Sequence, residues 1–160
     1  SGDRELYLAS THYHVEHTTG LAAFPATARY VNSKTQEADY GLGAAAHAGR
    51  FKEMSPTHAE LLRDMSRRTA DITFDREYTL DLGGVRVRFL MLGPTHTRGD
   101  TAFFVEGDTV LYAGDVVMNN SFVAANQDSS MTAWLAALDA LERMAPRVIV
   151  PAHGPIPHGR

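Results

Sequence analysis

The chain of 160 residues alternates between two hydrophobic periods, one typical of strands and one typical of helices. Short apolar runs and two-residue alternation predict strands in five segments: 5–10, 27–31, 75–93, 101–115 and 147–154. The third and fourth segments are long enough for two strands each, and each contains a glycine turn signal. Gly83–Gly84 and Gly107–Asp108 therefore predict two hairpins.

Apolar residues three and four positions apart predict helices between these strands. The expected helices cover 18–24, 33–48, 55–69 and 131–144. The last has the strongest amphipathic pattern, with Trp134 and Leu141 on one face. The third has a capping residue at Ser55 and is expected to place Leu61 and Leu62 on one face. Strands and helices mixed along a chain of this length predict one α/β or α+β domain.

Charge and composition exclude several classes of partner. The formal net charge of −4, without any block of like charges, argues against a nucleic-acid surface. No apolar run reaches the roughly 18 residues that a membrane span requires, so we expect a soluble protein of the cytoplasm or the periplasm. The chain has no cysteine, so any metal would be held by histidine, aspartate or glutamate.

Residues that can bind metals recur where the predicted strands end. The first strand leads into THYHVEH, and later strands lead to His96, Asp115 and His153. Because strand ends are where a rigid scaffold presents side chains, these exits could converge on one site. A lone loop histidine is more often simply hydrogen-bonded, so the prediction depends on the whole set. Imidazole and carboxylate ligands favour zinc, with iron or manganese as alternatives.

The motif THYHVEH allows two arrangements. In an extended segment, His12 and His14 point to the same side and can bind one ion, while Glu16 and His17 face a second ion. In a helix, His12 pairs with Glu16 and forms a single site. The spacing alone leaves both arrangements open.

Four motifs, THYHVEH, PTHTRGD, LYAGD and PAHGP, occur in this order and together resemble the metallo-beta-lactamase superfamily of hydrolases. The resemblance extends over residues 6–155, and the segment from Met131 onward is similar to a broad bacterial subgroup of hydrolases. It implies a four-layer αββα sandwich, in a single domain over residues 1–160, with a two-metal site at one edge.

The resemblance also implies a ligand set of seven residues. The first zinc would be bound by His12, His14 and His96, and the second by Glu16, His17 and His153, with Asp115 bridging the two. A hydroxide shared by the two ions would attack an ester, thioester, lactone, lactam or phosphoester bond.

Two residues, Asp115 and Glu16, are expected to act in catalysis. Asp115 would hold the ions together, and Glu16 would orient the nucleophile or pass its proton to the leaving group. The family usually has aspartate where this chain has Glu16, and the extra methylene changes the reach of the carboxylate. Asp100, four residues after His96, is expected to support a ligand or a turn rather than to bind metal.

The chain also departs from the family in length. Family domains usually begin with several strands before the first motif, which here starts at Thr11, and commonly continue past the last histidine. The domain is therefore expected to be incomplete at the N-terminus and, by the same comparison, at the C-terminus. A fragment, strands supplied by another chain and a trimmed fold are the three explanations. An incomplete sheet exposes edge strands, so we hypothesise a homo-oligomer formed by strand exchange.

Three other functions stay open on sequence grounds. Glu16 and the missing segments favour a non-catalytic or degenerate metal-binding module of the same fold. A redox di-iron enzyme fits less well, since those relatives have glutamate where this chain has His14, and the charge balance disfavours a nuclease. We expect a small-molecule substrate, with Tyr13, Asn119 and Asn120 as candidate pocket residues because they lie beside the motifs. The remaining histidines, expected to be structural or solvated, are His47, His58 and His158.

Overall fold

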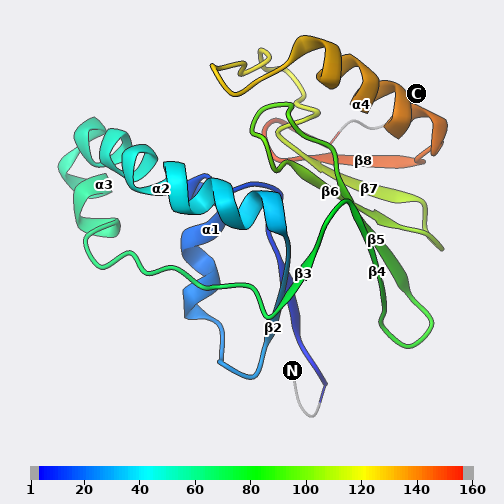
Figure 1. Cartoon of the computed structure of the whole chain (residues 1–160), viewed down its shortest axis with the longest axis horizontal. Coiled ribbons are helices and arrows are strands. Elements are labelled where there is room, and N and C mark those ends of the chain that lie inside the picture. The colour runs from blue at the N-terminus through cyan, green and yellow to red at the C-terminus, as the bar shows by residue number, and fades with distance from the viewer. Residues whose placement is uncertain (1–3, 157–160) are drawn as a thin grey trace.

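Two β-sheets form the centre of the protein, whose computed structural model describes residues 4–156 (Figure 1). The first sheet has three parallel strands in sequence order: β1 (Tyr7–Ala9), β2 (Arg29–Ser33) and β3 (Ile72–Phe74). The second sheet has five strands, also in sequence order: β4 (Glu77–Asp81), β5 (Arg86–Met91), β6 (Thr101–Val105), β7 (Val110–Gly114) and β8 (Val148–Pro151). Its neighbours pair antiparallel except β7 and β8, which are parallel.

Helices cover the outer face of each sheet, so the architecture is the expected four-layer αββα sandwich (Figure 1). On the side of the first sheet lie α1 (Val15–Thr18), the 3₁₀-helix η1 (Thr19–Ala23) and α2 (Lys34–Met54). Helix α3 (Pro56–Leu61) packs against α2, away from the sheet (Figure 1). The second sheet is covered by α4 (Met131–Arg143). None of the described helices is both long and apolar enough to cross a membrane.

The alternation of side chains along the strands builds the layers. In β5, Phe89 faces the first sheet and packs in a cluster with Val31 of β2 and Phe74 of β3. The neighbouring Leu90 points to the opposite face, where it belongs to the cluster that contains Trp134 of α4. The two-residue period seen in the sequence therefore places one set of residues between the sheets and the other under the helix.

Most predicted elements are present, but two differ from the expectation. The helix expected over 55–69 ends at Leu61, and Leu61 and Leu62 do not share a face, because Leu61 is 74% exposed whereas Leu62 is buried. After Leu62 the chain must return to the first sheet as β3, which the sequence pattern did not predict. Arg68 fixes this return segment by donating to the backbone carbonyls of Phe24, Pro25 and Ala28.

Helix α2 is longer than the predicted 33–48 and runs through three glycines to Met54. Ser33 caps it by accepting a hydrogen bond from the backbone N–H of Gln36 at 3.1 Å. One of the glycines lies close to Tyr13, because a Cβ on Gly43 would be 2.6 Å from the hydroxyl of that side chain. The close approach brings α2 next to the loop that follows β1.

The strand directions place three loop exits at one edge of the second sheet. Since β5 and β7 are each antiparallel to β6, they run in the same direction, and β8 runs parallel to β7. The carboxyl ends of these strands lead to His96, Asp115 and His153, respectively. The hypothesis of strand exchange between copies stays a prediction.

Candidate metal centre

The loop after β1 meets the exits of the second sheet through close backbone contacts. The backbone N–H of Thr101 donates to the carbonyl of Thr11 at 2.7 Å. Gly114, at the end of β7, has a φ of +57°, and a Cβ there would lie 2.6 Å from the Cβ of Thr11. Only glycine lets the two segments approach this closely, and the approach places Asp115 beside the histidines that follow Thr11.

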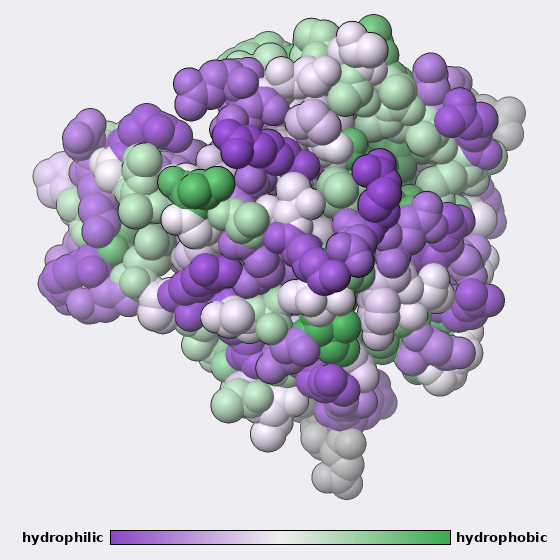
Figure 2. Space-filling view, viewed as in Figure 1, coloured by the Kyte–Doolittle hydropathy of each residue, from purple (hydrophilic) through white to green (hydrophobic). Residues whose placement is uncertain are grey.

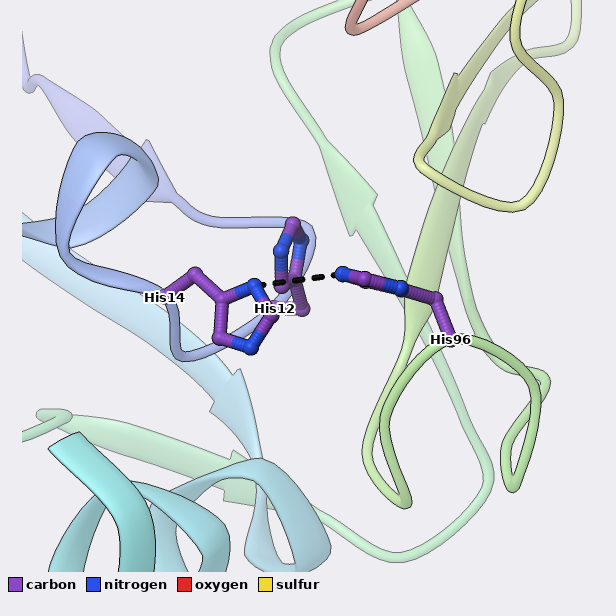
Figure 3. A group of neighbouring side chains, drawn as sticks. All are labelled: His12, His14 and His96. Atoms are coloured by element: carbon purple, nitrogen blue, oxygen red, sulfur yellow. Dashed lines mark hydrogen bonds between the residues drawn. The ribbon is translucent and has the colours of Figure 1, made fainter. Parts of the chain in front are cut away.

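Three buried imidazoles converge at this junction, two from the loop after β1 and one from the loop after β5 (Figure 3). The ring centroids of His12, His14 and His96 are 4.6 to 4.9 Å apart in each pair. Nδ1 of His14 lies 3.1 Å from Nε2 of His96. Two nitrogens bound tetrahedrally to one zinc ion at about 2.0–2.1 Å would be separated by roughly 3.3 Å, so the spacing fits a shared cation.

Asp115 lies at the centre of a second group of histidines. Its carboxylate is 3.6 Å from Nε2 of His17, 3.6 Å from Nε2 of His96 and 3.5 Å from Nε2 of His153. His12, His17 and Asp115 also place one ligand atom each within 4.8 Å of one another. The side chain of Asp115 is 6% exposed, so a carboxylate is buried among histidines that approach it from helix α1 and from two loops.

Several polar atoms of this cluster are buried without a partner. Nε2 of His12, Nε2 of His17 and Oδ1 of Asp115 have no hydrogen-bond partner within the described part of the chain. Leaving such groups unpaired costs about 1–3 kcal/mol each, and more for a charged group. A cation bound among these atoms would satisfy all of them, so the residues present fit a metal ion.

Hydrogen bonds on the far side of two rings orient them for this role. Nδ1 of His96 donates to the carbonyl of Ala124 at 2.6 Å, since a carbonyl oxygen can only accept. In the tautomer that makes this bond, the lone pair is on Nε2, which faces His14 and Asp115. Nδ1 of His12 lies 3.3 Å from the hydroxyl of Thr11, which leaves its Nε2 for the cluster.

Burial favours the neutral form of three imidazoles of the cluster, and the neutral form is the one that binds metals. Burial and the neighbouring histidines lower the pKa of His12, and burial lowers the pKa of His14 to about 2. Burial also lowers the pKa of His17, against the opposing effect of Asp115. The same desolvation raises the pKa of Glu16. Neutral imidazoles do not need to lose a proton before they bind a cation.

Two loops that carry candidate ligands are held by polar residues beneath them. Asp100 lies below the loop of His96 and accepts hydrogen bonds from the backbone and side chain of Thr97, as well as from the hydroxyl of Thr95. Asn119 donates from its backbone N–H to the carbonyl of His153 at 3.2 Å. Both residues therefore fix the course of a loop rather than reach into the cluster.

Glu16 lies at the border of the cluster and has two histidine neighbours. One carboxylate oxygen is 4.0 Å from Nε2 of His17, and the other is 3.7 Å from Nδ1 of His47. Sequence reasoning missed His47, which is buried against His14. A signal was available, because Ala44, His47 and Ala48 occupy one buried face of α2 at helical spacing.

The other residues singled out in the sequence lie around the histidine cluster, elsewhere in the fold or outside the described part of the chain. The ring of Tyr13 contacts His14 edge-on, with centroids 4.8 Å apart, and it lines a cavity of about 590 Å³ together with Arg50 and Asn126. Asn120 adopts a positive φ of 54°. His58 bonds to Ser55 at the start of α3 and packs edge-on against Phe51, with ring centroids 6.1 Å apart, while His158 lies outside the described residues. Polar residues gather over one face of the molecule, as Figure 2 shows, with apolar side chains scattered among them.

Comparison with known proteins agrees with the fold and the motif pattern. The model of the metallo-beta-lactamase superfamily matches residues 3–153, so the chain belongs to this superfamily. A search of curated proteins gives no match. The structure is similar to solved structures of the superfamily, and three of them are compared by sequence identity, TM-score and coverage.

The first is a metallo-beta-lactamase from Pontibacter korlensis, with 22% identity and a TM-score of 0.67, covering 94% of this chain and 62% of that one. The second is a metallo-beta-lactamase family protein from Thermus thermophilus, with 22% identity, a TM-score of 0.69 and coverage of 94% and 55%. The third is the metallo-beta-lactamase FIM-1 from Pseudomonas aeruginosa in a mono-zinc form, with 19% identity, a TM-score of 0.64 and coverage of 94% and 59%. The chain thus spans less than two thirds of the length of these relatives.

Proposed function

We propose that the protein is a metal-dependent hydrolase with two adjacent cation positions. The observation that supports this most directly is the buried cluster of unpaired ligand atoms on His12, His17 and Asp115. Superfamily membership supports hydrolysis as the reaction class, and the mono-zinc relative supports zinc as the metal. In this proposal the first cation is bound by His12, His14 and His96.

The second cation would be held by His17 and His153, with Glu16 as a further ligand and Asp115 placed between the two positions. The 3.5 and 3.6 Å distances from the carboxylate of Asp115 to histidines of both groups favour this central role. When bound, such ions lower the pKa of water and stabilise negative charge that develops on oxygen.

The residues of the chain contribute position, exclusion of water and proton handling. His12, His14 and His96 are each less than 10% exposed, so one side of the centre is dry. Glu16 is the carboxyl group at the solvent side, with 31% of its side chain exposed, and burial raises its pKa. A carboxyl group in this position can accept a proton from the attacking water and return it to the leaving group.

In this proposal the cavity beside Tyr13 holds the remainder of the substrate, away from the bond that is cleaved. Two residues of its wall contact the centre. Tyr13 contacts the ring of His14, and Asn126 donates to the backbone carbonyl of His96 at 2.9 Å. Arg98 in its wall is paired with Asp128, whereas Arg50 has no ion pair within the described part of the chain. We therefore favour substrates with an anionic group remote from the bond that is cleaved.

The test is metal content by mass spectrometry, followed by hydrolysis of chromogenic ester, thioester, lactone, lactam and phosphoester substrates, each with and without an anionic group. We expect about two transition-metal ions per chain, and hydrolysis that a chelator abolishes and zinc restores. Preference for the anionic member of a pair should fall in Arg50→Gln. One tightly held ion without hydrolysis of any substrate would refute the proposal and favour a non-catalytic metal-binding module of the same fold.

A further inference from the structure

His47 contacts the candidate metal centre from an element that carries none of the seven expected ligands. It lies in α2, and its side chain is 8% exposed. The ring stacks on that of His14, with centroids 3.8 Å apart and an angle of 4° between the planes. Phe51, one turn further along α2, packs on His47 with centroids 5.0 Å apart. The ring of His14 is therefore backed by a second aromatic ring that is itself held in place.

The same side chain also binds the start of helix α1. Nδ1 of His47 accepts a hydrogen bond from the backbone N–H of Val15, with a length of 3.4 Å. Val15 is the first residue of α1, and the first N–H groups of a helix have no acceptor within the helix. His14 is the N-cap residue and makes no side-chain capping bond. His47 thus provides a cap from another helix, and the turn that it caps carries Glu16 and His17.

The geometry does not favour His47 as a ligand. His14, Glu16 and His47 each place one ligand atom within 4.8 Å of the others. However, an imidazole lone pair lies in the plane of its ring, so the lone pairs of two stacked rings run parallel and do not converge on one ion. Nδ1 of His47 is occupied by the N–H of Val15, and its distance of 3.7 Å from the carboxylate of Glu16 is too long for a hydrogen bond.

We propose that His47 is a positioning residue of the metal centre, which fixes the ring plane of His14 and the first turn of α1. Through these two contacts one side chain sets both cation positions. His14 belongs to the first position, and Glu16 and His17 belong to the second. The inference rests on the metal-binding part of the proposed function and not on hydrolysis.

The two contacts can be separated by substitution. His47→Phe keeps an aromatic face for His14 but removes the acceptor for Val15. His47→Asn keeps an acceptor near the place of Nδ1 but removes the stacked ring, and His47→Ala removes both. His58→Phe is the matched control. His58 is also a helical histidine with a local hydrogen bond, and phenylalanine keeps an aromatic ring against Phe51, the residue that packs on His47.

The measurement is a titration of the metal-free full chain with Co²⁺ alone, followed by visible absorption in competition with a chelator. Thermal unfolding of the metal-free variants is recorded in parallel. Positioning residues behind metal ligands typically change affinity by about 10- to 100-fold. We expect His47→Ala to weaken both Co²⁺ steps within this range. His47→Phe should weaken mainly the second step, and His47→Asn should change the spectrum and affinity of the first step. His58→Phe should change neither.

Three results would overturn the proposal. The first is wild-type affinity and spectra in all three His47 variants. The second is a lower unfolding temperature in these variants with unchanged Co²⁺ binding, which would indicate a purely structural histidine. The third is loss of one whole equivalent in His47→Ala, which would make His47 a ligand. If the wild type binds two ions and hydrolyses nothing, the proposed function fails, and the Co²⁺ pattern still decides the role of His47. If the wild type binds no Co²⁺, both fail.

Discussion

Replacement of Asp100 should destabilise the protein by an amount that depends on whether an acceptor remains. The side chain is 2% exposed and has no positively charged partner among its hydrogen bonds. Oδ2 accepts from the backbone N–H of Thr97 at 2.7 Å and from the hydroxyl of Thr95, and Oδ1 accepts from the hydroxyl of Thr97 at 2.6 Å. All three donors belong to the loop that carries His96.

The magnitude follows from these three bonds and the cost of burying the carboxylate. A hydrogen bond to a charged group contributes about 1.5–3 kcal/mol, so the gross contribution is roughly 4–9 kcal/mol. Burial opposes it, since burial raises the pKa of Asp100 although three donors lower it. We therefore expect Asp100→Ala to lower the free energy of unfolding by about 3–5 kcal/mol, a large part of the 5–15 kcal/mol of an ordinary domain.

Asp100→Asn is the matched variant. Its amide oxygen can replace Oδ2 and keep the bonds from Thr97 N–H and the Thr95 hydroxyl, and the Thr97 hydroxyl can rotate to accept from the amide NH₂. The loss should be only about 1–2 kcal/mol. Urea unfolding of the metal-free proteins at neutral pH measures both values. Equal destabilisation by the two variants, or a loss below about 1 kcal/mol in Asp100→Ala, would refute the hydrogen-bond argument.

Three further predictions concern the metal centre directly. Asp115→Ala should keep the fold, reduce bound metal from two ions to one and abolish hydrolysis; full turnover in this variant would contradict its central role. Gly154→Ala places a Cβ in collision with the carbonyl oxygen of Asn119 at a φ of +89°, so it should shift the loop of His153 and weaken the second ion by about tenfold or more. Gly20→Ala, with no atom within 4 Å of the new Cβ, is its control, and equal affinities would contradict the argument. Zinc at 100 times its dissociation constant should stabilise the protein by about 2.7 kcal/mol and raise the unfolding temperature by roughly 5–10 °C in calorimetry; an unchanged temperature would mean that the unpaired ligand atoms do not bind it.

The fold could be predicted where local signals decide the structure. The turn at Gly83–Gly84 is followed by the expected hairpin of β4 and β5, with both glycines at positive φ. Strand β3 gives no comparable signal. It has three residues, and it is a strand because Ile72 and Phe74 pair with β2 far away in the sequence. The helix over 55–69 was predicted too long because long-range contacts also decide its end. The hydrogen bonds of Arg68 to the loop after η1 hold this segment extended, although its sequence has helical propensity.

The candidate centre was predictable to a similar extent. The residues that follow strand ends could be named because the exit of β1 from the first sheet meets three strand exits of the second sheet. These residues are His12, His96, Asp115 and His153. His47 could not be placed in the same way, because its position depends on how α2 packs on the loop after β1. That packing depends on small residues in α2 and on the space that Tyr13 occupies, both of which are tertiary features.

The structure also gives the two proposed cation positions different environments, which no motif indicates. His12 is fully buried, and His14 and His96 are 7% and 5% exposed, so an ion held by these three is shielded from solvent. The side chains of Glu16 and His153 are 31% and 49% exposed, so the second position is open. An ion at an open position exchanges with solution more readily and can bind a further ligand such as water or a substrate. A shielded ion exchanges slowly and has no room for a further ligand. Under the proposed function, a substrate would therefore reach the centre from the side of Glu16 and His153. The extra methylene of Glu16 relative to aspartate changes the reach of a carboxylate at this open position.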